Sequence, residues 1–205
     1  LMSLIDYIDS IYLKFGATQT VYGDDNKEAV RKIQKDAASA DLSLIPARIR
    51  HLGTDKCFEI LTLMRDHLKE KCTIRTSDGV AEILVEDGRY VGVETTRGEK
   101  IYSKYLIAAP GREGSEWFTT QAGRLGLDMI TNPVDIGVRV EVPAVVMEQI
   151  TDVVYESKLV YYTKSFDDRV RTFCMNPYGV VVAENNAGLI TVNGHSNAEK
   201  TSENT

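Results

Sequence analysis

The chain has 205 residues, of which 43% are apolar and 26% charged, and its formal net charge is −6. This length predicts one large or two small globular domains with a substantial hydrophobic core. The acidic balance argues against nucleic acid as a partner, because phosphate binding depends on clustered Lys and Arg, and no apolar run approaches the roughly 20 residues of a membrane span.

The three cysteines predict neither a disulfide framework nor a zinc site. None of them forms a C-x-x-C pair or stands at ligand spacing from a histidine, and the three histidines are too scattered to bind a metal together. Reduced, mostly buried thiols are typical of cytoplasmic proteins, so we expect that compartment and no metal. The cysteines are Cys57, Cys72 and Cys174.

The first third of the chain predicts three helices. Apolar residues recur at helical spacing over 1–15, 25–40 and 54–71, and Thr54 is the expected N-cap of the third helix. Pro46 lies between the second and third helices, in a short segment that we expect to be extended or at a sheet edge.

A three-stranded β-meander is predicted next. Alternating β-branched residues indicate strands over 80–85, 89–95 and 101–109. Gly88 and Gly98 lie between them in dipeptides that favour tight hairpin turns. Antiparallel pairing of consecutive strands is therefore expected in this region.

The remaining chain predicts a helix capped by Ser115 and then mostly strands. Apolar and polar residues alternate over 136–142, which predicts a strand with one buried face, and Pro143 suits the first turn of a short helix. The polar stretch 196–205 indicates a cut chain rather than a natural terminus. The whole pattern predicts a mixed α/β chain of the α+β class. Further strands are expected at 159–163, 170–175, 180–184 and 189–192, with turns at 176–179 and 185–188.

The predicted strand 101–109 ends in Ala-Ala-Pro-Gly, which leaves almost no side chain at its tip. Small residues there allow a ligand or another backbone to approach closely. Arg112 follows at the carboxyl end of the strand, where open α/β sheets bind their ligands. The alternative is a tight strand-to-helix turn with Arg112 in solvent, and the tetrapeptide itself does not decide between the two.

Two basic residues are candidate ligands for an anionic substrate. His51 precedes a helix N-terminus, where free N–H groups favour a phosphate or carboxylate. Arg139 lies on the polar face of the predicted strand 136–142 and suits a bidentate contact with a carboxylate. The structural alternatives are that Thr54 simply caps the helix, and that Arg139 pairs with Glu141 or with a neighbouring strand.

Two predicted strands end in turns that carry polar side chains. Asn176 follows Cys174 and Met175, and His195 follows Asn193-Gly194, so both could reach the same sheet edge. Asn176 is then a candidate for a hydrogen bond to substrate or cofactor, and His195 for proton transfer. The alternative is turn chemistry, since Asn before Pro or Gly is a common turn former.

The order of these elements resembles that of glutathione-reductase-like flavoproteins, in which a meander is followed by a strand with a small-residue turn. Further tracts extend the resemblance over essentially the whole chain. Together they are similar to the family of uncharacterised FAD-dependent, NAD-utilising dehydrogenases found in bacteria. The tracts are RHLGTDK at 50–56, DIGVRVEVP at 135–143, FCMNP at 173–177 and VNGHS at 192–196.

The resemblance implies an internal piece of an FAD-dependent oxidoreductase, in which the flavin transfers hydride and this region shapes the pocket of an unidentified small substrate. NAD(P)H is the implied reductant. The G-x-G-x-x-G that holds the FAD pyrophosphate is missing, since no two of the fifteen glycines are separated by a single residue. The isolated piece is therefore expected to be inactive and to need the remainder of the flavin domain. The implied FAD contacts are Val80, Ala109, Gly111 and Arg112. The resemblance also implies three regions, which are the helical part of a cap at 1–53, a partial FAD-binding domain with the meander at 54–126, and a strand-rich substrate or cap domain at 127–205.

Two other classes of function stay open. One is a non-catalytic α+β module that binds a small anion or a protein through the sheet edge carrying Asn176 and His195. The other is a tRNA-modifying flavoprotein, against which the acidic balance and the lack of an expected basic, aromatic-rich face both count. The sequence contains no P-loop, no H-E-x-x-H and no G-x-S-x-G motif.

Overall fold

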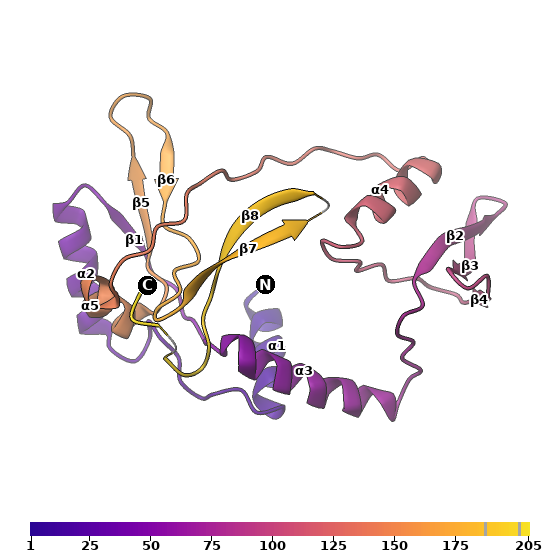
Figure 1. Ribbon diagram of the computed structural model, residues 1–205, viewed down its shortest axis with the longest axis horizontal. Helices are drawn as coiled ribbons and strands as arrows, with labels where there is room; N and C mark the ends of the chain where they lie inside the picture. The colour runs from indigo at the N-terminus through magenta and orange to yellow at the C-terminus, as the bar shows by residue number, and fades with distance from the viewer. Residues whose placement is uncertain (187, 201) are drawn as a thin grey trace. The chain divides into compact units, whose positions relative to one another are not determined.

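The computed structural model describes residues 1–186, 188–200 and 202–205. Within these residues it contains five helices and eight strands in three small antiparallel sheets, so the predicted α+β class is confirmed (Figure 1). The chain divides into two compact units. Unit 1 combines Leu1–Glu70 with Val138–Thr205, and unit 2 is Lys71–Gly137.

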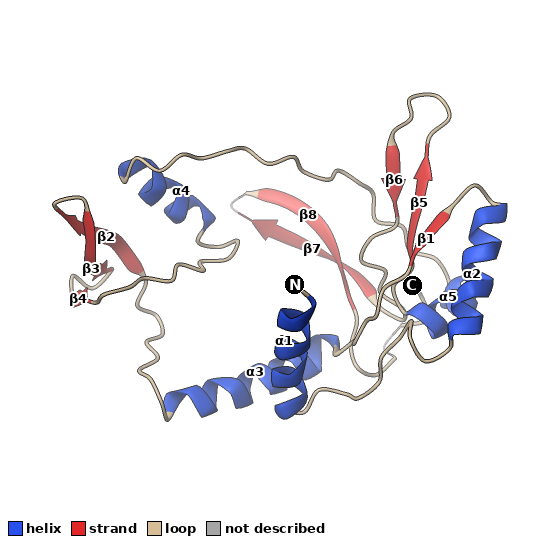
Figure 2. Ribbon diagram, turned by 180° about the vertical axis from the view of Figure 1, so that it is seen from behind, coloured by secondary structure: helices blue, strands red, loops and turns tan. Residues whose placement is uncertain are grey.

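Helices and strands alternate irregularly along the chain (Figure 2). The five helices include the three predicted in the first third of the chain and those predicted after Ser115 and Pro143. The elements are α1 (Met2–Lys14), α2 (Lys27–Ser39), β1 (Ser43–Ile45), α3 (Gly53–Lys69), β2 (Val80–Glu86), β3 (Arg89–Thr95), β4 (Lys100–Tyr102), α4 (Ser115–Arg124), α5 (Ala144–Val154), β5 (Lys158–Tyr162), β6 (Arg169–Arg171), β7 (Val180–Asn186) and β8 (Leu189–His195).

Unit 1 has its core where α2 and α5 meet each other and α2 meets the sheet β1-β5-β6. The apolar side of α2 is buried as its helical spacing predicts, through Val30 and Ala37. Leu44 at the centre of β1 is buried too. Burial of such apolar surface is the main stabilising contribution to a unit of this size.

Arg50 fastens α1 to the rest of unit 1. Its Nε and Nη2 atoms donate to the two carboxylate oxygens of Asp9 at 2.7 and 2.9 Å, and Nη1 donates to the carbonyl of Thr18. The bidentate arrangement suits a planar guanidinium. This hydrogen bonding lowers the pKa of Asp9 below its ordinary value, so the carboxylate stays charged.

The N-terminus of α3 differs from the predicted one. The helix begins at Gly53, and its N-cap residue Leu52 makes no side-chain cap. Gly53 has φ +78°, and a Cβ there would collide with the backbone of Asn197 and Ala198. Thr54 uses its backbone N–H to bind the carbonyl of Ser196 at 2.9 Å, so tertiary contact replaces the expected cap.

Unit 2 contains the predicted meander, with β3 between β2 and β4. Side chains of α4 bind the outer edge of β2: Gln121 Oε1 accepts from the N–H of Ile83 at 3.1 Å, and Trp117 Nε1 donates to the carbonyl of Ala81 at 3.0 Å. Arg124 also donates to the carbonyl of Ile83. Polar groups that an edge strand would leave unpaired are thereby satisfied.

Three predicted strands are shorter or missing. The strands expected over 101–109 and 170–175 end at Tyr102 and Arg171, and residues 136–142 form no strand. Ile107, Ile136 and Val138 are 93%, 94% and 88% exposed. A strand needs a hydrogen-bonding neighbour, and among the described residues none pairs with these apolar stretches.

The C-terminal residues return to the body of unit 1, although their polar sequence predicted no such contact. Val142 and Thr205 exchange backbone hydrogen bonds of 2.8 and 3.0 Å, and Pro143 bridges to Asn204. Strands β7 and β8 form the predicted hairpin, with Val180 opposite His195 at its base. Ala187 in the turn predicted between them lies outside the described residues.

Candidate functional site

Arg139 lies at the centre of a polar cluster in unit 1. Its Nη1 donates to the carbonyl of Cys174 at 2.7 Å, and its Nη2 donates to Oδ1 of Asn193 at 3.0 Å. The guanidinium therefore joins the loop after β6 to the strand β8. Glu141, the partner considered from the sequence, instead accepts a hydrogen bond from Asn204.

Asn176 belongs to the same cluster. Its Nδ2 donates to the carbonyl of Cys174 at 2.6 Å, which thus accepts from both Asn176 and Arg139. Cys174 has φ +52°, an uncommon backbone conformation for a residue with a side chain. The close approach depends on Gly194, because a Cβ there would collide with Asn176 Nδ2 and lie 3.3 Å from Arg139 Nη1.

Glu184 connects this cluster to His195. Its Oε1 accepts from Asn193 Nδ2 at 3.2 Å and lies 3.5 Å from His195 Nε2. The side chains of His195 and Glu184 are 39% and 26% exposed, so both are partly accessible. A carboxylate beside an imidazole can hold the orientation of the ring.

His51 lies in a second, aromatic cluster. Its ring stacks on that of Tyr155 with centroids 4.2 Å apart and an interplanar angle of 21°, and Tyr22 packs against Tyr155 at 5.0 Å. Tyr155 also shares a 3.1 Å hydrogen bond with Oγ of Ser196. Its backbone has φ +54° and ψ −70°, a strained conformation that the packed ring holds in place.

Burial sets the charge state of the aromatic cluster. It lowers the pKa of His51 below its ordinary value near 6.5, and a hydrogen bond to the Asn197 backbone and the charge of Asp55 oppose this only in part. Within the described residues, the Nε2 atom of His51 is buried and has no hydrogen-bond partner. Burial also raises the pKa of Tyr155, so both rings are neutral near pH 7.

The two clusters meet in the segment from Asn193 to Asn197. Asn193 and His195 belong to the polar cluster, whereas Ser196 and Asn197 contact the aromatic one. Three residues singled out in the sequence therefore belong to the polar cluster, although they are far apart along the chain: Arg139, Asn176 and His195. His51 belongs to the aromatic cluster, which the segment 193–197 joins to the polar one.

The N-terminus of α3 is already occupied by the chain itself. The N–H of Thr54 binds the carbonyl of Ser196, and the side chain of Asp55 accepts from the N–H of Ala198 at 2.8 Å. The anion contact considered for His51 at this terminus would have to displace Ser196 and approach the carboxylate of Asp55. We therefore assign His51 to packing against Tyr155.

The residues implied to contact FAD all lie in unit 2. Val80 is the first residue of β2 and pairs with Thr95. Ala109, Gly111 and Arg112 are exposed in the connection between β4 and α4. Gly111 has φ +67°, and a Cβ there would meet no atom within 4 Å. This turn is exposed, which fits both the predicted ligand approach and the alternative of a plain strand-to-helix turn with Arg112 in solvent.

Sequence reasoning did not identify Glu184, Asn193, Tyr155 and Ser196. Glu184 is the last residue of the predicted strand 180–184, and Asn193 directly follows the predicted strand 189–192. The hairpin register places Asn193 opposite Val182, which is two residues from Glu184. Diagonal neighbours on one face are within reach of long side chains, so that register was the available signal. Nothing in the sequence indicates the positions of Tyr155 and Ser196.

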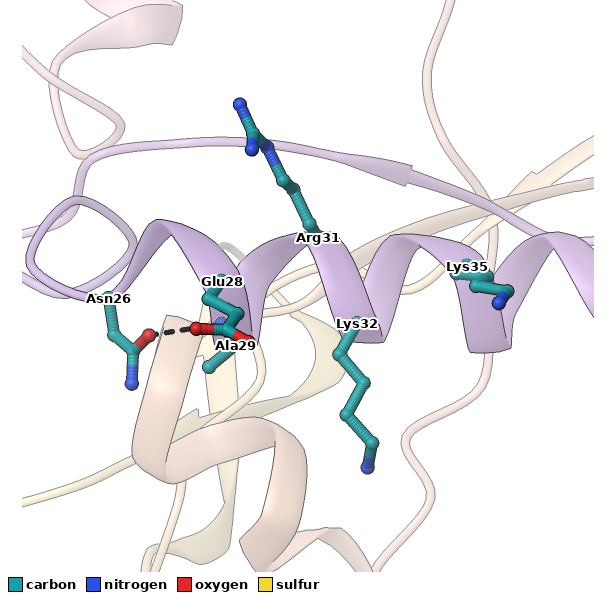
Figure 3. Close-up of a pocket in the computed structure, with 6 residues that line it drawn as sticks. All are labelled: Asn26, Glu28, Ala29, Arg31, Lys32 and Lys35. Atoms are coloured by element: carbon teal, nitrogen blue, oxygen red, sulfur yellow. Dashed lines mark hydrogen bonds between the residues drawn. The ribbon is translucent and has the colours of Figure 1, made fainter.

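A shallow hollow lies along α2 (Figure 3). None of its lining residues belongs to the polar or the aromatic cluster. The hollow is lined by side chains of that helix and of its N-cap, and includes none of the predicted site residues. Among the described residues no group of three or more His, Cys, Asp or Glu side chains is arranged to bind a metal. The lining residues are Asn26, Glu28, Ala29, Arg31, Lys32 and Lys35.

Comparison with known proteins gives no family assignment. No protein-family model and no curated protein matches the chain. No helix in the described part of the chain is long and apolar enough to cross a bilayer. The arrangement of the side chains is thus the observation on which a function can be argued.

Proposed function

We propose that this chain is an internal region of an FAD-dependent oxidoreductase, in which unit 1 shapes the substrate pocket and unit 2 contributes to the flavin site. The observation that carries the proposal is the convergence of Arg139, Asn176 and His195 in the polar cluster of unit 1. These residues come from three separate tracts, all of which carry the family resemblance. The substrate is a small molecule, and NAD(P)H is the proposed reductant.

The residues of unit 2 fit one part of FAD. The open turn at Gly111 presents backbone without an intervening side chain, which suits the flat face of a flavin, and Val80 would lie on the adenine side. Arg112 and Ala109 flank the same turn. No glycine-rich helix start among the residues of the chain fits the pyrophosphate. When bound, FAD would supply the hydride chemistry.

Within unit 1, proton transfer is assigned to His195. Glu184, 3.5 Å from its Nε2, would hold the orientation of the ring. The side-chain Oδ1 of Asn176 would accept a hydrogen bond from the substrate, while its Nδ2 donates to the carbonyl of Cys174. Arg139 donates to Cys174 and Asn193, so we assign it to holding these loops in position rather than to direct substrate contact.

Exposed apolar segments support the proposal that further polypeptide completes the flavin domain. Ile107 and Ile136 are almost fully exposed, and each lies in a stretch whose sequence predicts a strand. Apolar strands with unpaired backbone groups are stable only when another strand covers them. The remainder of the flavin domain is the proposed partner.

A matched pair of glycines tests the flavin assignment. Gly111 and Gly98 have φ of +67° and +79°, and a Cβ at either would meet no atom within 4 Å. The two Gly→Ala substitutions therefore introduce similar backbone strain. In the protein extended at both ends, Gly111→Ala should weaken FAD binding, measured by quenching of flavin fluorescence, and Gly98→Ala should not.

Equal affinities for the two variants would remove Gly111 from the flavin site. If the extended protein binds no FAD at all, the oxidoreductase proposal fails. The non-catalytic binding module then becomes the better interpretation. It would be tested with a variant in which Arg139, Asn176 and His195 are all substituted.

A further inference from the structure

Strands β5 and β6 form a hairpin (Figures 1 and 2). Its register places basic and aromatic residues on one face. The register pairs Tyr162 with Arg169 and Val160 with Arg171. Because side chains alternate along a strand, the residues at even positions of β5 share a face with those at odd positions of β6. We name this surface the hairpin face and define it as Lys158, Val160, Tyr162, Arg169, Arg171 and Phe173, of which Val160, in the middle, is buried.

Direct contacts confirm that these side chains share a surface. The Nζ atom of Lys158 lies 5.4 Å from the ring centroid of Phe173, and Cζ of Arg171 lies 4.9 Å from it. Two cations thus flank one aromatic ring. The rings of Tyr162 and Phe173 are each 55% exposed, which leaves aromatic surface for another molecule.

The hairpin face differs in charge from the chain as a whole. The chain has a net charge of −6, whereas the strands β5 and β6 contain basic residues and no acidic one. The nearest acids in the sequence are Glu156 before β5 and the pair Asp167 and Asp168 in the turn. Lys164, in the same turn, lies 3.4 Å from Asp41 and is excluded from the face.

We propose that the hairpin face binds single-stranded nucleic acid. Tyr162 and Phe173 would stack on bases, and Lys158, Arg169 and Arg171 would contact phosphates, the combination by which sheet surfaces hold single strands. The exposed side chains of the face lie along two strands, whereas sites for free nucleotides are concave and enclose most of their ligand. An extended polymer therefore fits it better than a dinucleotide.

In the sequence, two observations argued against nucleic acid as a partner. One was the acidic net charge, and the other was that no basic, aromatic-rich face was expected. The hairpin supplies that face, because pairing brings Arg171 and Phe173 beside Lys158, 13 to 15 positions away along the chain. The remaining acidic charge predicts modest affinity and strong dependence on salt. The proposal is independent of the flavin assignment.

The test uses the whole chain and a fluorescein-labelled decamer of uridine, with binding followed by fluorescence anisotropy. For three phosphate contacts, the slope of log K against log salt should be about −2, so affinity falls about 20-fold between roughly 50 and 200 mM salt. A duplex of the same length should bind more weakly, because its bases cannot stack on the rings.

Variants separate stacking from charge. Phe173→Leu and Tyr162→Leu should each weaken binding roughly fivefold or more at unchanged salt slope, and Arg171→Gln should make the slope shallower by about 0.7. Arg31→Gln removes the same charge from α2, a helix without aromatic residues, and should change neither the affinity nor the salt slope. Circular dichroism spectra matching that of the unmodified protein establish that each variant is folded.

Three results would overturn the proposal. The first is unchanged affinity in both ring variants, and the second is equal binding of duplex and single strand. The third is displacement of the decamer by NADPH at equal concentration, which would assign the face to a dinucleotide instead. A deoxythymidine decamer that binds like the uridine decamer supports it, since the rings and cations do not contact the sugar specifically.

Discussion

Arg139 and Asn193 are joined by a hydrogen bond of 3.0 Å across 54 positions of the chain, from Nη2 to Oδ1. The same guanidinium binds the carbonyl of Cys174. One side chain thus fixes both the loop after β6 and the end of β8, and through Asn193 it also reaches Glu184. The position of the proposed proton acceptor depends on this arrangement.

Replacing Arg139 with lysine should therefore destabilise unit 1. An ammonium cannot donate to both Cys174 and Asn193 with the planar geometry of a guanidinium, so we expect a loss of about 1–3 kcal/mol in the free energy of unfolding. Urea denaturation of Arg139→Lys measures it. Arg31→Lys on the exposed side of α2 is the control, and equal stability of the two variants would show that the Arg139 contacts are not important.

Gly194 and Gly123 provide opposite expectations for the same substitution. A Cβ at Gly194 would collide with Asn176 Nδ2, whereas one at Gly123 in α4 would meet no atom within 4 Å. Gly194→Ala should lower the melting temperature, and Gly123→Ala should raise stability by about 0.5–1 kcal/mol because alanine favours a helix. Differential scanning calorimetry measures both, and a neutral Gly194→Ala would contradict the packing described.

His51 should make the stability of unit 1 depend on pH. Its pKa in the folded chain lies below the ordinary value near 6.5, so the unfolded chain binds the proton more readily. Its contribution is constant above about pH 6.5 and is lost as the pH falls from there through the lower folded pKa.

The free energy of unfolding between pH 5 and 8 measures this effect, with His51→Phe as the matched variant. Phenylalanine keeps an aromatic ring against Tyr155 but cannot titrate. The difference between the two proteins should therefore change with pH below about 6.5 and stay level above it. A difference independent of pH would show that His51 is not buried as described.

Gln121 should be important for unit 2. Its side chain is buried and binds both the N–H of Ile83 and the carbonyl of Ala81, at 3.1 and 3.3 Å. Gln121→Leu keeps the size but leaves the N–H of Ile83 without its partner, whereas the carbonyl of Ala81 keeps Trp117, and the loss should cost about 1–3 kcal/mol. Hydrogen exchange of the Ile83 amide should accelerate in this variant and not in the exposed control Thr120→Ala. Unchanged exchange would contradict the edge contact.

Much of the fold could be predicted because it depends on local sequence. The helical spacing of apolar residues located α2 and α3, and glycine-containing turns located the β2-β3 hairpin. The strand expected over 136–142 is absent because a strand requires a neighbour, which its own alternation cannot supply. The N-cap of α3 was predicted two residues too late, at Thr54 instead of Leu52, since contact with Ser196 replaced the cap by Thr54.

The candidate site was predictable in its residue types but not in its contacts. Asn176 and His195 were identified from turns predicted to end their strands, although β6 ends at Arg171 and His195 lies within β8. The partners of Arg139 are a carbonyl and an amide far away in the sequence, and no local pattern indicates them. Tyr155 could not be found either, because its role follows from a strained backbone that brings its ring onto His51.

Titration of FAD by quenching of its fluorescence tests the central claim most directly. It compares the 205-residue chain with a protein extended at both ends. The proposal predicts tight binding by the extended protein and weak or no binding by the shorter chain, which has no site for the pyrophosphate. If neither protein binds FAD, the meander and the turn at Gly111 are structural only, and the oxidoreductase assignment is wrong.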